Sequence, residues 1–142
     1  MGNVDVGVRV RVYMEDARKF LKEASREFED GVRTGDLIKV RDAAEKAWNA
    51  VVQATNALIL ALTGKVPASH WERSALRELE KVNEELERLG FRDRYGARER
   101  YLHETVFYEG IVNVEDVRYE LEKVRKYLDD VEDVLAKAGL MK

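Results

Sequence analysis

A chain of 142 residues with 45% hydrophobic residues, 37% charged residues and one proline has the size and composition of one ordered, soluble domain. Its net charge of −3 excludes a globally basic nucleic-acid-binding protein, although a local basic patch stays possible. The absence of cysteine excludes disulfides, thiolate metal sites and a cysteine nucleophile, and two histidines leave little for zinc, so we expect neither a metal nor a cofactor.

The sequence lacks the signals that direct a chain into or across a membrane. Its start has no basic segment, apolar core and small-residue cleavage site of a signal peptide. No run reaches the roughly 18 apolar residues of a membrane-spanning helix. We therefore expect a cytoplasmic protein with no membrane partner. A single glutamine beside many glutamates, lysines and arginines is typical of thermophilic proteins.

Residues 4–12 alternate between valine and other residues, and a period of two is typical of a β-strand. No later segment reads as a second strand. The segment would pair with its own copy from another protomer, since an unpaired edge promotes association, or lie as an extended arm on the bundle; the alternative is a first helical turn. We predict an extended N-terminal arm or strand over 1–13 and a helical-bundle domain over 14–142.

Two helices are predicted next. The first, over about 14–31, has an apolar stripe formed by Ala17, Phe20, Leu21, Ala24 and Phe28. The second begins at Asp36, which can cap free backbone N–H groups, and ends near Gly64. Its second half is apolar nearly all round, which predicts the most buried helix of the fold. Its three amides, Asn49, Gln53 and Asn56, need partners inside.

Three more helices follow. Ser69 and Glu72 form a capping box before a helix that Gly90 ends. The next helix contains residues 98–110. Asn113 caps the last one, whose apolar residues recur at spacings of three and four: Val114, Val117, Leu121, Val124, Leu128, Val131, Leu135 and Ala138. This seam packs inside the chain or partly on a partner. Short connections favour an all-α, up-and-down bundle of about five helices.

An arginine-rich stretch is a candidate nucleic-acid surface. Five arginines lie between Arg88 and Arg100, with aromatic residues among them. Such interleaving suits phosphate contacts together with stacking on exposed bases. A solvated helix face with ion pairs to acidic neighbours accounts for the same residues.

His103 is the candidate for chemistry. Arg100 shares its helical face, and Glu99, four residues earlier, can hold the imidazole in one tautomer. Arg98 lies about 140° away around a regular helix, so it converges with His103 only if the helix breaks near Gly96. In RNA cleavage His103 would take or give the proton at the 2′-hydroxyl, and an arginine would stabilise the charge on the phosphorane without a metal.

Structural explanations compete with this one. His103 can be packed between helices and hydrogen-bonded to a carboxylate or amide, and His70 beside Trp71 reads as structural or half exposed. A metal held by both histidines would need a tertiary closeness that the sequence does not show. The chain has no glycine-rich phosphate loop and no serine triad.

Three segments resemble the characteristic blocks of the PaREP family of uncharacterised archaeal proteins. In chain order they are GDLIKVRDAAEKAWNAVVQATNALI, SHWERSALREL and RYLHETVFYEG. Residues 43–50 and 102–110 are the most distinctive pieces, and the resemblance covers most of the chain from about 14 to 135. It implies an archaeal helical bundle that self-associates as a homodimer or larger oligomer.

That family in turn resembles the HEPN group, the higher eukaryotes and prokaryotes nucleotide-binding domains. Many of its members are dimeric bundles that act as metal-independent ribonucleases through an arginine followed four to six residues later by a histidine. Arg98 and His103 have this spacing. Other relatives bind nucleotides or act as partners of a nucleotidyltransferase or toxin.

The block around Trp48 offers further candidates, since Glu45 and Asn49 share one helical face; a structural network accounts for them equally. We predict that the chain is an RNA-binding protein or a metal-independent endoribonuclease. Its catalytic residues would be Arg98, Arg100 and His103, with Glu99 as the orienting group. The first alternative is a non-catalytic, homo-oligomeric interaction module. The second is a nucleotide or small-ligand site between helices, with ligand-binding residues Glu45, Asn49, His103 and Tyr108.

Overall fold

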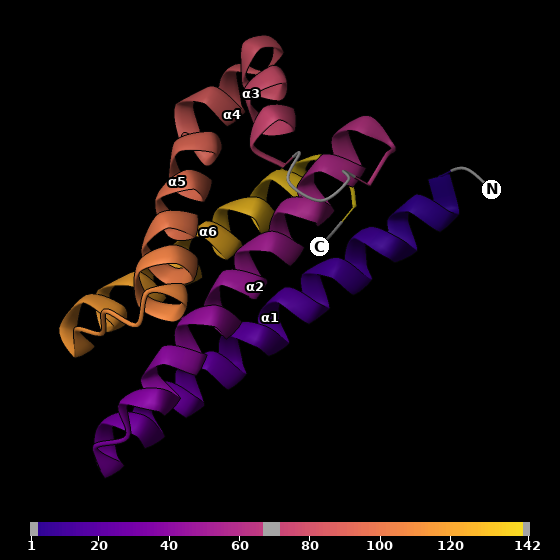
Figure 1. Ribbon diagram of the computed structural model, residues 1–142. Coiled ribbons are helices and arrows are strands. Elements are labelled where there is room, and N and C mark those ends of the chain that lie inside the picture. Colours follow the sequence, from indigo (N-terminus) through magenta and orange to yellow (C-terminus); the bar gives the residue numbers. More distant parts are fainter. Residues whose placement is uncertain (1–2, 67–71, 141–142) are drawn as a thin grey trace.

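The computed structural model describes residues 3–66 and 72–140. Within these ranges the chain is all-α, as predicted, and has no strand. Its elements are α1 (Asn3–Thr34), α2 (Leu37–Thr63), α3 (Glu72–Val82), α4 (Glu84–Leu89), α5 (Phe91–Arg98), the π-helix η1 (Glu99–Tyr108) and α6 (Val114–Lys137). The helices α1 and α2 form a long hairpin, α6 packs against both, and the rod made by α5 and η1 packs on α2 and α6 (Figure 1).

The prediction of an extended arm over 1–13 is wrong for the described residues, because α1 already begins at Asn3. Its buried face has spacings of three and four from the start, formed by Gly7, Val10, Met14, Ala17, Leu21, Ala24, Phe28 and Gly31. The alternating valines scatter around this helix, and Val8 and Val12 are exposed. A continuous helical seam that buries apolar surface outweighs the modest β preference of valine.

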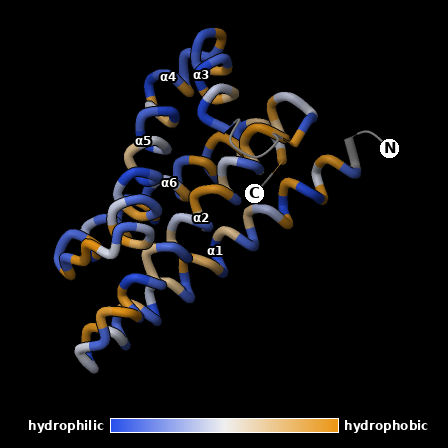
Figure 2. Tube along the Cα trace, viewed as in Figure 1, coloured by the Kyte–Doolittle hydropathy of each residue, from blue (hydrophilic) through white to orange (hydrophobic). Residues whose placement is uncertain are grey.

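The helix α2 is the most buried element, as predicted. The Asp36 carboxylate accepts hydrogen bonds from the backbone N–H groups of Ile38 and Lys39, and Gly64 ends the helix in the left-handed conformation at φ 76°. Its buried residues include six alanines: Ala43, Ala44, Ala47, Ala50, Ala54 and Ala57. Figure 2 shows that hydrophobic residues dominate its second half, whereas α3 and α4 are mainly hydrophilic. None of the described helices combines the length and apolar character that crossing a membrane requires.

The turn between α1 and α2 depends on a close approach at Gly31. A Cβ atom at this buried glycine would lie 2.9 Å from the carbonyl oxygen of Asp36 and 3.0 Å from side-chain atoms of Lys39 and Val40. The Asp36 N–H donates to the Gly31 carbonyl over 2.8 Å. The backbone therefore has no room to move away from an added methyl group.

We predict that Gly31→Ala lowers the free energy of unfolding by about 1–3 kcal/mol, the usual cost of overpacking. The matched control is Gly96→Ala on α5, where the added Cβ would meet Arg73 Cδ at an ordinary 3.7 Å. That variant should gain about 0.5–1 kcal/mol from a stiffer unfolded chain and better helix propensity. Urea denaturation measures both changes. Equal shifts in the two variants would contradict the close approach at Gly31.

The single helix predicted before Gly90 is divided in two. Asn83 leaves the helical conformation, and its side chain accepts a hydrogen bond from the Leu86 N–H, which starts α4. An asparagine is a good N-cap and a poor residue for a helix interior, so it breaks the apolar repeat. Gly90 then ends α4 at φ 68°. The predicted capping residue Ser69 and the neighbouring His70 lie outside the described residues.

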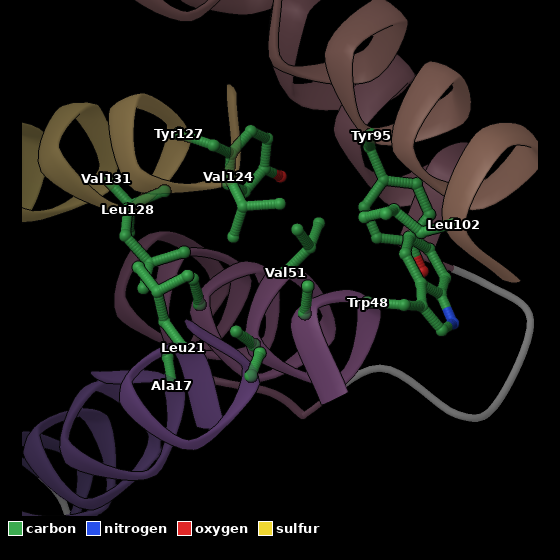
Figure 3. Packing of buried hydrophobic residues seen from close by; sticks show 14 of the residues in the cluster. Ala17, Leu21, Trp48, Val51, Tyr95, Leu102, Val124, Tyr127, Leu128 and Val131 are labelled. Carbon is green, nitrogen blue, oxygen red and sulfur yellow. The ribbon is translucent and has the colours of Figure 1, made fainter. Parts of the chain in front are cut away.

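The predicted seam of α6 lies inside the chain. Asn113 caps this helix through a hydrogen bond from the Asp116 N–H, and all seam residues from position 117 to 135 are buried. Figure 3 shows part of this packing, with Val124, Leu128 and Val131 facing the α1–α2 hairpin. Tyr127 is also buried there, and its hydroxyl lies 2.6 Å from Thr55 Oγ1 of α2. Burial raises the pKa of the Tyr127 phenol, which therefore stays protonated.

Candidate functional site

The stretch singled out in the sequence forms an unusual helix. From Glu99 to Tyr108 the backbone is a π-helix that continues α5 without a loop, and Gly110 follows its end at φ 72°. In a π-helix each carbonyl bonds five residues ahead, and such segments occur frequently at functional sites. The wider turn changes which side chains share a face, so the spacing rules of a regular α-helix do not apply to His103.

His103 is held by a carboxylate from another helix. Its Nδ1 lies 2.8 Å from Oε1 of Glu45 on α2, and 38% of the histidine side chain is exposed. The Trp48 indole stacks on the imidazole with the ring centroids 6.1 Å apart and an interplanar angle of 29°. The Phe107 ring also stacks on it, with a centroid distance of 6.4 Å and an interplanar angle of 16°. The imidazole is therefore fixed by one hydrogen bond and two aromatic rings while part of it reaches solvent.

The hydrogen bond to Glu45 determines the tautomer. A carboxylate accepts hydrogen bonds, so in the neutral ring Nδ1 carries the proton and Nε2 has the free lone pair. Among the described residues no hydrogen bond to Nε2 is present. Nε2 is therefore the ring nitrogen that has a lone pair to offer to a substrate.

The prediction that Glu99 orients His103 is therefore wrong. The Glu99 carboxylate instead pairs with Arg73 of α3 at 3.0 Å, and Glu45 takes the orienting position. Glu45 had been assigned to a ligand-binding site from its place beside Asn49. Between the described residues, no hydrogen bond joins the Asn49 or Tyr108 side chain to this pair, and Tyr108 is 77% exposed.

Trp48 connects the His103 site to the hydrophobic core. Its ring meets Tyr95 of α5 edge to face at 5.0 Å, and Figure 3 shows it beside Tyr95 and Leu102. Burial raises the pKa of the Tyr95 phenol, and the nearby carboxylates of Glu72 and Glu99 raise it further. The phenol therefore stays neutral beside Trp48.

Arg41 fastens the end of η1 to α2. Its Nε donates to the Phe107 carbonyl at 2.5 Å and its Nη2 to the Tyr108 carbonyl at 3.3 Å, while the guanidinium lies 5.9 Å from the centre of the Phe107 ring. The last carbonyls of a helix lack intrahelical partners, and a cation there is stabilising. Arg41 thus positions Phe107 against His103. The sequence analysis missed this residue, because its partners are backbone atoms far along the chain.

Arg98 does not join His103. Its Nε donates to Oε1 of Glu120 on α6 at 2.6 Å, and its Nη2 lies 3.5 Å from Oε2. Both side chains are nearly inaccessible, with exposed fractions of 9% and 5%. A signal for this pair was present in the sequence, since Glu120 lies beside Leu121 on the buried face of α6, where an acidic residue requires a partner. Arg100, by contrast, is exposed.

Within the described ranges, no group of three or more histidine, aspartate or glutamate side chains gathers in an arrangement that could hold a metal ion. His70, considered in the sequence as a second metal ligand, lies outside those ranges. The arrangement around His103 offers acid–base chemistry. One oriented imidazole with a free ring nitrogen can accept and return a proton.

Comparison with known proteins identifies a family and nothing closer. The model of the archaeal PaREP1/PaREP8 family matches residues 12–128, which is most of the chain. No curated protein and no solved structure matches. All residues of the Glu45–His103 site, and the buried pair of Arg98 and Glu120, lie inside the matched region.

Proposed function

We propose that this chain, which belongs to the archaeal PaREP1/PaREP8 family, is a HEPN-like RNA-binding protein that cleaves RNA by acid–base chemistry at His103. The observation that carries the proposal is the 2.8 Å contact between His103 Nδ1 and the Glu45 carboxylate on a ring that is 38% exposed. A histidine oriented by a carboxylate and open at its other nitrogen has the form of a general base.

RNA supplies its own nucleophile, so one base is enough to start the reaction. Nε2 of His103 accepts the proton of the 2′-hydroxyl while the 2′-oxygen forms a bond to phosphorus. The bond between phosphorus and the 5′-oxygen breaks, that oxygen takes a proton from water, and the imidazolium gives its proton to the hydroxide that remains. The products are a 2′,3′-cyclic phosphate and a free 5′-hydroxyl. Glu45 stabilises the imidazolium that forms in between.

The exposed side chains of η1 suit an RNA substrate. Arg100 is exposed on the same π-helix, and its guanidinium can bind the charged phosphate oxygens as the phosphorane develops. Tyr101 and Tyr108 are exposed aromatic residues on η1, and bases stack readily on such rings. Arg98 has no catalytic part in this proposal, since its guanidinium is bound to buried Glu120.

The test is cleavage of a 5′-labelled, single-stranded RNA in EDTA. We expect the wild-type protein to release a cyclic phosphate end, and His103→Ala to lower the rate about 10²- to 10⁴-fold, which is the usual contribution of a general base. Glu45→Gln should also lower the rate. Glu104→Gln is the matched control, because Glu104 is an exposed carboxylate on the same helix and should leave the rate unchanged.

Two results would contradict the proposal of RNA cleavage at His103. One is the absence of cleavage by the wild-type protein over a panel of RNA sequences. The other is a His103→Ala protein that cleaves as well as the wild type. An RNA with a 2′-deoxy sugar at the cleaved position should not be cleaved, because it lacks the 2′-hydroxyl that acts as the nucleophile.

A second candidate function, self-association, is favoured by exposed apolar residues at one end of the bundle. Leu37 and Ile38 start α2, and Ile111 follows η1; all three are exposed. The hydrogen bonds from Arg41 to the end of η1 bring these two segments together. We propose that this end binds a second copy of the chain.

The test is the oligomeric state in sedimentation experiments. The double variant Ile38→Asp with Ile111→Asp should shift a dimer to a monomer, whereas the control Val12→Asp on α1 should leave the dimer unchanged. A monomeric wild type would contradict the proposal of self-association.

A further inference from the structure

A cleft between α3 and α5 is lined mainly by arginines. Its lining consists of Arg73, Ser74 and Arg77 of α3 and Arg92 of α5, and its volume is about 190 Å³. Every one of these side chains offers hydrogen-bond donors, and no carboxylate is among them. Four other clefts of the described surface each have at least one aspartate or glutamate in their lining.

The positions of the arginines follow from the two helices. Arg73 and Arg77 are four residues apart on α3, so they lie on one face, and Arg92 faces them from α5. Gly96, one turn after Arg92, lies beside the Arg73 stem, since a Cβ there would be in ordinary contact with Arg73 Cδ at 3.7 Å. Like charges held together in this way repel one another, and an anion in the cleft would relieve the repulsion.

The neighbouring carboxylates neutralise the cleft only in part. Arg77 and Arg92 each approach the acidic residue next to them in sequence, Glu78 at 3.6 Å and Asp93 at 3.8 Å. Both separations exceed hydrogen-bond length, and both carboxylates are exposed, so these pairs are weak. Arg73 has a closer partner in Glu99 at 3.0 Å.

One more carboxylate lies at this cleft. Oε2 of Glu80 accepts a hydrogen bond from the backbone N–H of Arg92 at 2.9 Å. Its charge is directed to the main chain of α5 rather than to a guanidinium in the lining. The Arg77 and Arg92 guanidinium groups therefore keep donors for a further anion.

We propose that this cleft binds a phosphate group. Guanidinium groups present paired N–H donors that match two phosphate oxygens, and the Ser74 hydroxyl can donate to a third. The volume is below the roughly 300–1,000 Å³ of sites for drug-sized ligands, which suits one phosphate rather than a whole nucleotide. The group is either one phosphate of an RNA strand or a free phosphate anion.

The cleft and the His103 site are linked through the rod formed by α5 and η1. Arg73 bonds to Glu99, the first residue of η1, and Tyr95 between them packs on Trp48, which stacks on His103. An RNA strand held by its phosphate in the cleft would thus be bound to the same rod of α5 and η1 that contains the imidazole. The RNA form of this inference rests on the proposed RNA binding, but not on cleavage by His103.

The experiment measures binding of two probes to the full chain. The first is a fluorescein-labelled, single-stranded RNA followed by anisotropy in EDTA, and the second is inorganic phosphate followed by calorimetry. The test variant is Arg77→Gln with Arg92→Gln. The control is Arg33→Gln with Arg125→Gln, which removes the same charge from exposed arginines of α1 and α6. His103→Ala is measured alongside both.

We expect the test variant to bind RNA at least about 10-fold more weakly at 0.1 M salt and the control to change less than about 3-fold. The slope of log K against log salt should fall by about 0.7 for each lost phosphate contact. His103→Ala should bind RNA normally. If the test variant loses affinity for inorganic phosphate and no RNA binds to the wild type, the cleft takes a free phosphate anion.

Equal losses in the test and control variants would overturn the inference, as would a wild type that binds neither probe. These outcomes are separate from the fate of the proposed function. A protein that binds RNA through Arg77 and Arg92 but never cleaves it would contradict catalysis by His103. It would still support phosphate binding in the cleft.

Discussion

Replacing Arg98 with methionine should lower the free energy of unfolding by about 3–5 kcal/mol, because the change leaves the Glu120 carboxylate buried without its partner. The two groups are bonded through Nε at 2.6 Å, and water reaches almost none of either side chain. Methionine has a similar length and fills the same space. The loss therefore comes from an uncompensated charge and not from a cavity. Urea denaturation followed by circular dichroism gives the value.

A double variant separates the charge from the packing. Arg98→Met with Glu120→Leu removes both charges and should recover most of the loss, since well-packed apolar residues can replace a buried ion pair at little cost. Arg125→Met is the surface control. Its pair with Glu122 is half exposed, and its loss should cost less than about 1 kcal/mol. If the single and double variants were equally unstable, the charge would not be the cause.

Replacing Phe28 with alanine should cost about 3–5 kcal/mol, the range for removing a large aromatic side chain from a core. Phe28 is only 1% exposed, and the Arg118 guanidinium of α6 covers its ring at 5.0 Å. The space would open between α1 and α6, next to a cleft that Phe28 lines together with Leu21 and Leu121.

Phe20→Ala is the matched comparison for this experiment. Both phenylalanines were placed on one stripe by the sequence analysis, but Phe20 is only partly buried and lines a shallow cleft with Asp16, Lys19 and Glu23. Its removal should cost about 1 kcal/mol, in proportion to the smaller area that it buries. Similar losses at positions 20 and 28 would contradict the buried face assigned to α1.

The parts of the fold that could be predicted are those with local causes. Asp36 and Asn113 cap their helices with side chains two or three residues from their partners, so the sequence contains both members of each interaction. The seam of α6 was predictable for the same reason. A spacing of three and four along one helix determines a face whatever that face packs against.

The N-terminal segment shows where a local pattern misleads. Valines at every second position predicted a strand, yet Gly7, Val10 and Met14 continue the buried face of α1. Two periodicities are superimposed in this segment, and the choice between them depends on whether another helix is present to cover the face. That information is tertiary, and valine's preference for strands is too weak to decide alone.

The sequence predicted the histidine at the centre of the candidate site but not the residue that orients it. His103 stood out because histidine is rare in this chain. Its carboxylate comes from Glu45, 58 residues away, whereas reasoning along one helix could only reach Glu99. The π-helix added a second error, because its wider turn changes which residues share a face and has no sequence signal comparable to a cap.

The alanines of α2 have a consequence for how this protein can vary. They let neighbouring backbones approach the central helix closely, and their side chains are completely buried. A larger residue at one of these positions would push against α1, α6 or η1 with no empty space to enter. We therefore expect a saturation mutagenesis screen for folded protein to accept almost any exchange along the outer faces of α3 and α4. It should accept almost none at the buried alanines of α2.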